Sequence, residues 1–202
     1  MSDIQEQVRT AARILREGGI VLFPTDTVYA LAVDATNTEA IQKLKRLKGR
    51  DEGKPITVVV ADMAMAEKYV IVNDVGRKLT GRFLPGALTL IFERKNTVPD
   101  ELIGGGTTLG IRIPDHQFCL ALVNAFGSPY TATSANVSGE ETNCTVSDII
   151  DQFDERASLI DYIVDEGELP LRKPSTIVDV HNGEVTILRE GAIASERILK
   201  MV

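Results

Sequence analysis

A run of hydroxyl and amide side chains, TATSANVSG, occupies residues 131–139 and follows residues that read as a strand. Within it, Ser134 and Asn136 stand two residues apart. In an extended segment, residues with this spacing point to the same side, so a hydroxyl and an amide would lie next to each other. Together they can donate and accept hydrogen bonds, as recognition of a carboxylate, a ribose or a phosphate requires. The alternative is a capped turn that leads into the helix expected at residues 145–153.

A second group of candidates is cationic and lies in KRLKGRDEGKP, residues 45–55. A helix is predicted over residues 38–48, and Gly49 ends it, which places Lys48 at the end of the helix and Arg50 in the loop beyond. Arginine offers a planar fork and lysine a compact charge to the same anion, so the pair is suited to clamp a phosphate. The alternative is that these cations only complement the helix dipole.

Polar residues also follow the strand predicted at residues 20–24. The segment PTDTVYALAVDA brings Thr25 and Thr27 to the end of that strand, with Tyr29 close behind. Loops at the carboxyl ends of strands are where open α/β sheets bind their ligands. The two hydroxyls would hydrogen-bond a small polar substrate, and the tyrosine would form a wall. A turn built by the threonines, which merely ends the strand, is the alternative.

Two further arginines lie in or next to predicted strands. Arg112 is a cation inside the apolar segment TLGIRIP, and it needs either a bound anion or an internal carboxylate, between which the residues do not choose. Ser175 opens a late strand, and Arg189 ends the one after it. His116 and His181 stand apart from any nucleophile or metal ligand, so no Ser-His-Asp or Cys-His arrangement is predicted.

An α/β fold must position these residues. Apolar periodicity predicts helices at residues 4–16, 38–48, 115–126, 145–153 and 194–200. Strands are predicted at residues 20–24, 29–35, 56–61, 87–93, 108–114, 161–167, 175–180 and 184–190. Strands alternate with helices in the first half and outnumber them in the second, which indicates a mixed sheet. No linker divides the chain, so a single domain over residues 1–202 is predicted.

Composition limits the class of protein. The net charge of −7 argues against a globally basic nucleic-acid binder, although residues 43–54 form a local basic cluster. The two cysteines, Cys119 and Cys144, form no CxxC, so neither a zinc site nor a disulfide scaffold is suggested. Neither a Walker A sequence nor a GxGxxG after a strand occurs. The polar N-terminus lacks the pattern of a signal peptide, no stretch is long enough to span a membrane, and a cytoplasmic protein is expected.

Seven segments resemble, in order along the chain, the successive blocks of the YrdC/Sua5 family: PTDTVYALAVDA, KGRDEGKP, LPGALTL, TLGIRIP, TATSANVSG, KPSTIVDV and ILREGAI. The resemblance fits the short bacterial type. It implies one YrdC-like domain, a twisted mixed sheet flanked by helices. It also implies an L-threonylcarbamoyladenylate synthase, which joins L-threonine and bicarbonate to ATP, releases pyrophosphate and serves the threonylcarbamoyl-adenosine modification of tRNA.

The resemblance also implies roles for particular residues. The catalytic tetrad would be Lys48, Arg50, Ser134 and Asn136. ATP would contact Lys48, Arg50, Lys54, Thr108, Asn136, Cys144 and Arg189. L-threonine would contact Thr27, Arg112, Ser134 and Ser175, with Arg112 at the carboxylate. No metal site of the protein's own is implied, and Mg²⁺ is expected to enter with ATP.

The sequence departs from the family pattern at three positions. Ala30 replaces a glycine, Val59 stands where longer, two-domain members have a histidine, and Cys144 stands where a threonine is more common. All four tetrad residues remain. Two alternatives stay open: an RNA-binding protein that contacts tRNA or double-stranded RNA through residues 43–54, and a nucleotide-binding paralogue with another substrate. Proteins that transfer the threonylcarbamoyl group are the expected downstream partners.

Overall fold

The computed structural model describes residues 3–201, in which the strands form two sheets. The smaller sheet has the order β8-β2-β1-β9. Its strands are β1 (Val21–Phe23), β2 (Ala30–Ala32), β8 (Thr133–Ser134) and β9 (Tyr162–Ile163). β2 is antiparallel to β1 and β8, whereas β9 runs parallel to β1.

The larger sheet has the order β11-β10-β5-β6-β3-β7, and β4 pairs with β5 beside this path. Its strands are β3 (Val58–Val59), β4 (Val70–Ile71), β5 (Leu88–Arg94), β6 (Thr108–Arg112), β7 (Tyr130–Thr131), β10 (Thr176–Asp179) and β11 (Thr186–Arg189). β10 is parallel to β5 and β3 is parallel to β6, while β5 and β6 are antiparallel. The mixed α/β architecture predicted from the sequence is therefore confirmed, with the difference that the strands divide between two sheets.

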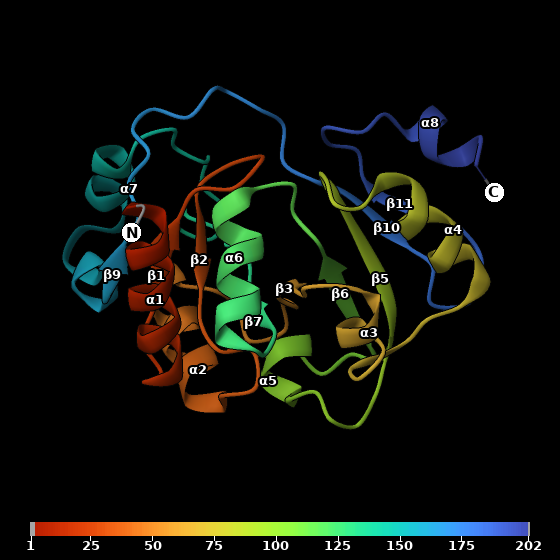
Figure 1. The fold of residues 1–202 in the computed structure, drawn as a ribbon, viewed down its shortest axis with the longest axis horizontal. Coiled ribbons are helices and arrows are strands. Elements are labelled where there is room, and N and C mark those ends of the chain that lie inside the picture. The colour runs from red at the N-terminus through yellow and green to blue at the C-terminus, as the bar shows by residue number, and fades with distance from the viewer. Residues whose placement is uncertain (1–2, 202) are drawn as a thin grey trace.

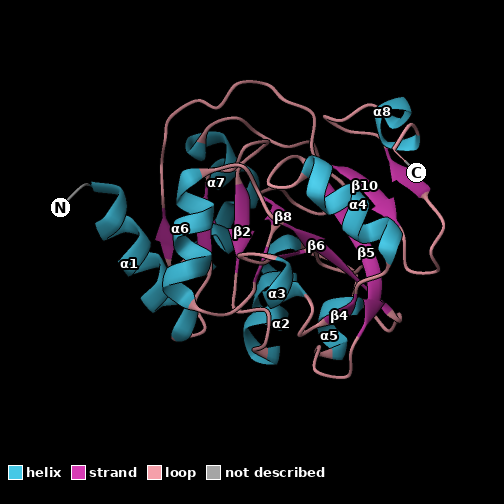
Figure 2. Ribbon diagram, turned by 45° about the vertical axis from the view of Figure 1, so that its right-hand side comes forward, coloured by secondary structure: helices cyan, strands magenta, loops and turns pink. Residues whose placement is uncertain are grey.

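Helices cover the sheets on several sides (Figure 1). They are α1 (Asp3–Arg16), α2 (Thr38–Lys48), α3 (Met63–Ala66), α4 (Asp74–Phe83), α5 (Asp100–Ile103), α6 (Gln117–Phe126), α7 (Val146–Phe153) and α8 (Ser195–Leu199), with a 3₁₀ helix at Asp154–Leu159. The five helices predicted from periodicity are all present. The sequence prediction missed α3, α4 and α5. Helices α1 and α8 lie at opposite ends of the molecule (Figure 2).

Two buried apolar clusters hold the elements together. The first lies around the larger sheet and α2, and it includes Leu44, Leu90 and Ile111. The second lies between α1, α6 and the smaller sheet, where the ring of Phe23 meets that of Tyr130 edge-on at 5.7 Å between centroids. An antiparallel bridge between Asp34 and Tyr130 links the segments that follow β2 and begin β7.

Helix α2 is capped at both ends. The side chain of Asn37 caps its start by accepting a hydrogen bond from the backbone N–H of Ala40. Gly49 ends it in the left-handed conformation, with φ 57°, which favours glycine. The backbone N–H of Arg50 then donates to the carbonyl of Lys45, so the chain turns sharply after Lys48. This cap places Lys48 and Arg50 on either side of the turn.

The connection from β9 to β10, residues 164–175, crosses from the smaller sheet to the larger one over the top of the molecule (Figure 1). Tyr29 anchors its start, since its hydroxyl donates to the carbonyl of Gly167 at 2.8 Å and accepts from the backbone N–H of Glu166 at 3.0 Å. Arg172 anchors its other end by donating to the carbonyl of Asp26 at 3.0 Å. Both ends are therefore fixed to the segment that follows β1. No helix among residues 3–201 is both long and apolar enough to cross a membrane.

Candidate active site

A cavity of about 380 Å³ lies against one face of the larger sheet. The alternation of strand residues builds its floor: β5 contributes Thr89 and Ile91, and β6 contributes Gly110 and Arg112. Residues from the loops after β1, α2 and β8 form the walls. Seven residues predicted from the sequence line this one cavity: Thr27, Arg50, Arg112, Ser134, Asn136, Ser175 and Arg189.

Arg112 has an internal carboxylate as its partner. Its Nη2 donates to Asp26 Oδ1 at 2.5 Å and to Thr27 Oγ1 at 3.1 Å. The side chains of Arg112 and Asp26 are 9% and 11% exposed, so the pair is nearly removed from water. Arg112 Nε is buried, and it has no hydrogen-bond partner within residues 3–201. The alternative left open by the sequence is thus answered in part, since the guanidinium has an internal carboxylate as its partner.

Strand β8 and the loop after it bring Ser134 and Asn136 to the cavity, and the two side chains meet as their spacing predicted. Ser134 Oγ donates to Asn136 Oδ1 at 2.5 Å. Asn136 Nδ2 donates to the carbonyl of Glu140 at 2.7 Å, which closes the loop after β8 on itself. The segment is therefore a hydrogen-bonded loop that also lines the cavity, and its role in binding a ligand stays a prediction.

Lys48 lies beneath that loop and is not among the residues that line the cavity. Its Nζ donates to the backbone carbonyls of Ser134 and Asn136, the latter at 2.7 Å, and to Asn136 Oδ1 at 3.3 Å. Burial, with a smaller contribution from the charge of Arg50, lowers the pKa of Lys48 to about 7. The pKa of the Lys48 ammonium group therefore lies near neutral pH.

Arg50 fixes the loop beyond α2. Its Nη2 donates to the carbonyl of Pro55 at 2.7 Å, and its Nε lies 3.4 Å from the carbonyl of Lys54. Burial lowers the pKa of Arg50 from its ordinary value. Lys54 itself is exposed, and its side chain does not line the cavity.

Ser175, which directly precedes β10, lies next to Arg189, the last residue of β11. Arg189 Nη2 donates to the carbonyl of Ser175 at 2.8 Å. The hydroxyls of Ser175 and Thr89 share a hydrogen bond of 3.0 Å. Burial, followed by the charge of Arg112, lowers the pKa of Arg189, and both guanidinium groups line this cavity.

Four positions assigned to ATP by resemblance lie outside the cavity lining: Lys48, Lys54, Thr108 and Cys144. Thr108 begins β6 two residues before Gly110, and Cys144 precedes α7. Contact of these side chains with a nucleotide stays a prediction. Of the departures from the family pattern, Ala30 and Val59 are buried in the second apolar cluster, so neither side chain lines the cavity.

Sequence reasoning did not single out several residues that the structure brings to the site. Asp26 lies between two hydroxyl residues that were noted, but nothing in the sequence paired it with Arg112. Thr57, Thr89 and Gly110 line the floor. A polar residue among the apolar neighbours of β5 was the signal that could have found Thr89. Glu140 is the one carboxylate among the described residues that line the cavity.

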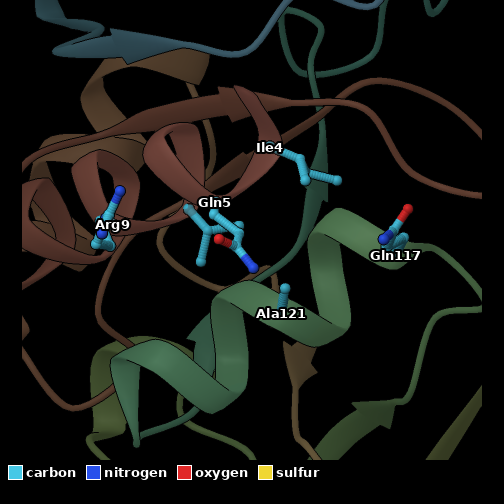
Figure 3. A pocket seen from close by; sticks show the side chains of 6 residues that line it. Ile4, Gln5, Arg9, Gln117 and Ala121 are labelled. Atoms are coloured by element: carbon cyan, nitrogen blue, oxygen red, sulfur yellow. The ribbon is translucent and has the colours of Figure 1, made fainter. Parts of the chain in front are cut away.

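A second cavity, of about 370 Å³, lies between α1 and α6 (Figure 3). Ile4 and Gln5 from α1 face Gln117 and Ala121 from α6 across it. Its lining mixes apolar and polar side chains, and it includes none of the residues that the sequence analysis assigned to a substrate. Within residues 3–201, no group of three or more His, Cys, Asp or Glu side chains could hold a metal ion.

Comparison with known proteins identifies the family of this chain. Residues 13–191 match the sequence model of the Sua5/yciO/yrdC family, which carries the description "Telomere recombination". The chain belongs to the Sua5/yciO/yrdC family. One relative is the threonylcarbamoyl-AMP synthase of Bacillus subtilis, which is 36% identical to this chain over 200 residues. That match covers 98% of this chain and 57% of the relative, so the chain spans just over half the relative's length.

Solved structures of Sua5 and YciO have the same fold. Pyrococcus abyssi Sua5 complexed with L-threonine superimposes with a TM-score of 0.91 at 31% identity, covering 98% of this chain and 58% of that one. E. coli YciO superimposes with a TM-score of 0.86 at 28% identity, covering 96% of this chain and 93% of that one. The YrdC-like fold implied by the sequence resemblance is therefore confirmed.

Proposed function

We propose that this protein is an L-threonylcarbamoyl-AMP synthase. The observation that carries the proposal is a single cavity lined by three guanidinium groups, those of Arg50, Arg112 and Arg189, together with the Ser134–Asn136 loop. An amino acid and a nucleotide both bring anionic groups. The name of the Bacillus subtilis relative and the L-threonine bound to Pyrococcus abyssi Sua5 support this pair of substrates.

The proposed chemistry balances without a covalent enzyme intermediate. The amine of L-threonine and bicarbonate form a carbamate and release water. A carbamate oxygen then attacks the α-phosphorus of ATP, the bond from that phosphorus to the bridging oxygen breaks, and pyrophosphate leaves. Such a reaction depends on positioning and on charge stabilisation more than on a nucleophilic side chain. The cavity supplies three guanidinium groups, from Arg50, Arg112 and Arg189.

Each residue has a proposed task. Arg112 receives the carboxylate of L-threonine, with the hydroxyls of Thr27 and Ser175 in the same cavity lining. Arg50 and Arg189 stabilise the phosphates, because guanidinium groups bind phosphate oxygens through paired hydrogen bonds. Lys48 supports the site from below, by holding the backbone of the Ser134–Asn136 loop.

Mg²⁺ is proposed to enter with ATP. Magnesium sites in enzymes that use ATP are commonly formed by the phosphates with one or two carboxylates and water. The carboxylate of Glu140, which lines the cavity, fits this pattern. When bound, the ion would neutralise part of the phosphate charge.

The RNA-binding alternative receives little support from the basic cluster. Lys43 Nζ lies 2.6 Å from Asp161 Oδ2, and Lys45 Nζ lies 2.8 Å from Glu52 Oε2. Lys48 is buried, so these three cations serve the protein itself, which leaves Arg46 and Lys54 as the exposed cations of the cluster. Contacts with tRNA and with downstream transfer proteins, like the cytoplasmic location, stay predictions.

Pyrophosphate release tests the proposal. The purified protein would receive ATP and Mg²⁺, with L-threonine and bicarbonate omitted in turn. Release that requires both substrates is the expected result. Release that requires neither would indicate another nucleotide-cleaving reaction, and no release with the complete mixture would favour the paralogue.

A further inference from the structure

Residues 168–173, here called the strap, run along the rim of the cavity on the larger sheet. Near one end, the backbone N–H of Leu169 donates to the carbonyl of Cys144 at 2.9 Å, in the loop after β8. Near the other end, Arg172 Nη1 donates to the carbonyl of Asp26 at 3.0 Å, in the loop after β1. Both loops contribute side chains to the cavity lining, so the strap connects two of its walls.

Few contacts hold the strap in place. Within residues 3–201, the two bonds just described are the hydrogen bonds that tie it to the rest of the protein. The side chain of Leu169 packs against the first apolar cluster, whereas Leu171, in the middle of the strap, is 90% exposed. Segments with few buried contacts and an exposed backbone open at the lowest cost in free energy. The strap can therefore change its conformation without disturbing the sheets.

The two ends of the strap differ in their freedom to move. Before it, Gly167 has a φ of 81°, and a Cβ atom there would meet no atom within 4 Å, so the backbone can rotate at this point. After it, Pro174 lines the cavity, and its carbonyl accepts from the backbone N–H of Ala192 at 2.9 Å. A Cβ atom at Gly191 would lie 2.1 Å from the same oxygen, so the chain packs tightly here. Gly167 is thus placed as a hinge, and Pro174 is a fixed end beside the cavity.

Two adjacent cations on the strap lack an anionic partner. Arg172 donates to a neutral carbonyl, and Lys173 forms no hydrogen bond or ion pair with the residues that the structure describes. A hydrogen bond from a guanidinium to a phosphate is roughly twice as strong as one between neutral groups. An anionic ligand in the cavity would therefore favour the strap conformation in which these cations face it, because only that conformation gains the stronger bonds.

We propose that the strap closes over the phosphates of a nucleotide bound in the cavity. Arg172 exchanges the carbonyl of Asp26 for a phosphate oxygen, Lys173 approaches the same group, and Leu171 moves out of water. The inference rests on the proposed function, since it needs a nucleotide at this site.

Fluorescence tests the closure directly. The sequence contains no tryptophan, so Leu171→Trp introduces a single indole at the most exposed part of the strap. Adding ATP with Mg²⁺ should shift its emission to shorter wavelengths and weaken its quenching by acrylamide. Leu199→Trp is the matched control, because Leu199 is 51% exposed on α8 and does not line the cavity. Its emission should not change with ATP.

The role of the phosphates is tested in the same variant. Adenosine, which has no phosphate, should leave the emission of Leu171→Trp unchanged, and an effect equal to that of ATP would contradict closure on the phosphates. Adding Arg172→Gln should raise the ATP concentration that gives half of the change by about tenfold or more, the value of a hydrogen bond to a charged group. Lys78→Gln, which removes an exposed cation from α4, should not raise it.

Limited digestion with trypsin provides a measurement on the unaltered protein. Cleavage after Arg172 requires that its side chain leave Asp26 and enter the protease, and the product, residues 173–202, is identified by its mass. ATP should slow this cleavage. Cleavage after Lys200, which is exposed near the C-terminus, should proceed at the same rate with and without ATP.

Calorimetry of ATP binding separates the failure of this inference from that of the proposed function. If ATP binds, yet neither the introduced indole nor the bond after Arg172 becomes protected, the inference is overturned, whether or not pyrophosphate is released. If both become protected while no mixture releases pyrophosphate, the assignment as a synthase fails and the closure of the strap stands. If ATP does not bind, both are overturned.

Discussion

Asp26 binds Arg112 through a 2.5 Å contact in which both side chains are almost wholly buried. A buried charge that loses its partner is strongly destabilising, whereas an exposed pair contributes little. Asp26 does not line the cavity, but it binds the guanidinium of Arg112, which does, and so holds that group in place.

Asp26→Ala is expected to lower the free energy of unfolding by about 3–5 kcal/mol, since it leaves Arg112 charged and unpaired in the interior. Urea denaturation measures the loss. Glu67→Ala is the matched control, because Glu67 pairs with Arg77 at 2.6 Å on the surface and should cost at most about 1 kcal/mol. Equal losses in the two variants would contradict the burial argument.

Lys48 should make stability depend on pH. Its pKa falls from 10.5 in the unfolded chain to about 7 in the folded protein, so the unfolded state binds more protons between these values. The free energy of unfolding therefore gains a contribution that rises from pH 7 to pH 10.5, by up to about 1.4 kcal/mol per pH unit. Denaturation at pH 7.5 and 9.5 should show a smaller rise for Lys48→Met than for the wild-type protein. The same slope in both would show that Lys48 titrates normally.

Arg50→Ala and Asn136→Ala are expected to lower kcat/KM for pyrophosphate release by about 10²–10³-fold, which is typical of losing a group that stabilises charge in the transition state. Arg46→Ala removes an exposed cation from the same end of α2 and should have no comparable effect. Thermal unfolding of each variant shows whether a folding defect contributes. Activity equal to that of the wild-type protein in either cavity variant would remove that residue from the site.

The two cysteines should react at different rates with a thiol reagent. Burial raises the pKa of the Cys119 thiol far above its usual range, so this residue should react only on unfolding. Cys144 is partly exposed and should react first. Saturating ATP should slow that first reaction if Cys144 contacts the nucleotide as predicted. An unchanged rate with ATP bound would exclude Cys144 from the nucleotide site.

The sequence predicted those parts of the structure that depend on local chemistry. Helix α2 was predicted over its observed residues because Gly49 marks its end and its apolar residues repeat every three or four positions. The spacing of Ser134 and Asn136 predicted that their side chains would meet. The resemblance identified seven residues that the structure brings to one cavity.

Long-range pairing explains what the sequence could not predict. Gly110 faces Thr57 and Thr89 only because β6 lies between β3 and β5, and that strand order is not visible in any local pattern. The division of strands into two sheets has the same origin. The pairing of Asp26 with Arg112, 86 positions away, needed the fold as well.

The residues that line the cavity are far apart in the sequence, from Thr27 near the N-terminus to Arg189 near the C-terminus. During synthesis from the N-terminus, the loop after β1 is made early, whereas β10 and β11 are made late. A nascent chain therefore carries Asp26 and Arg112 long before Ser175 and Arg189 can join them. Ligand binding cannot assist the early stages of folding on the ribosome, and the site becomes complete only when its last strand has paired.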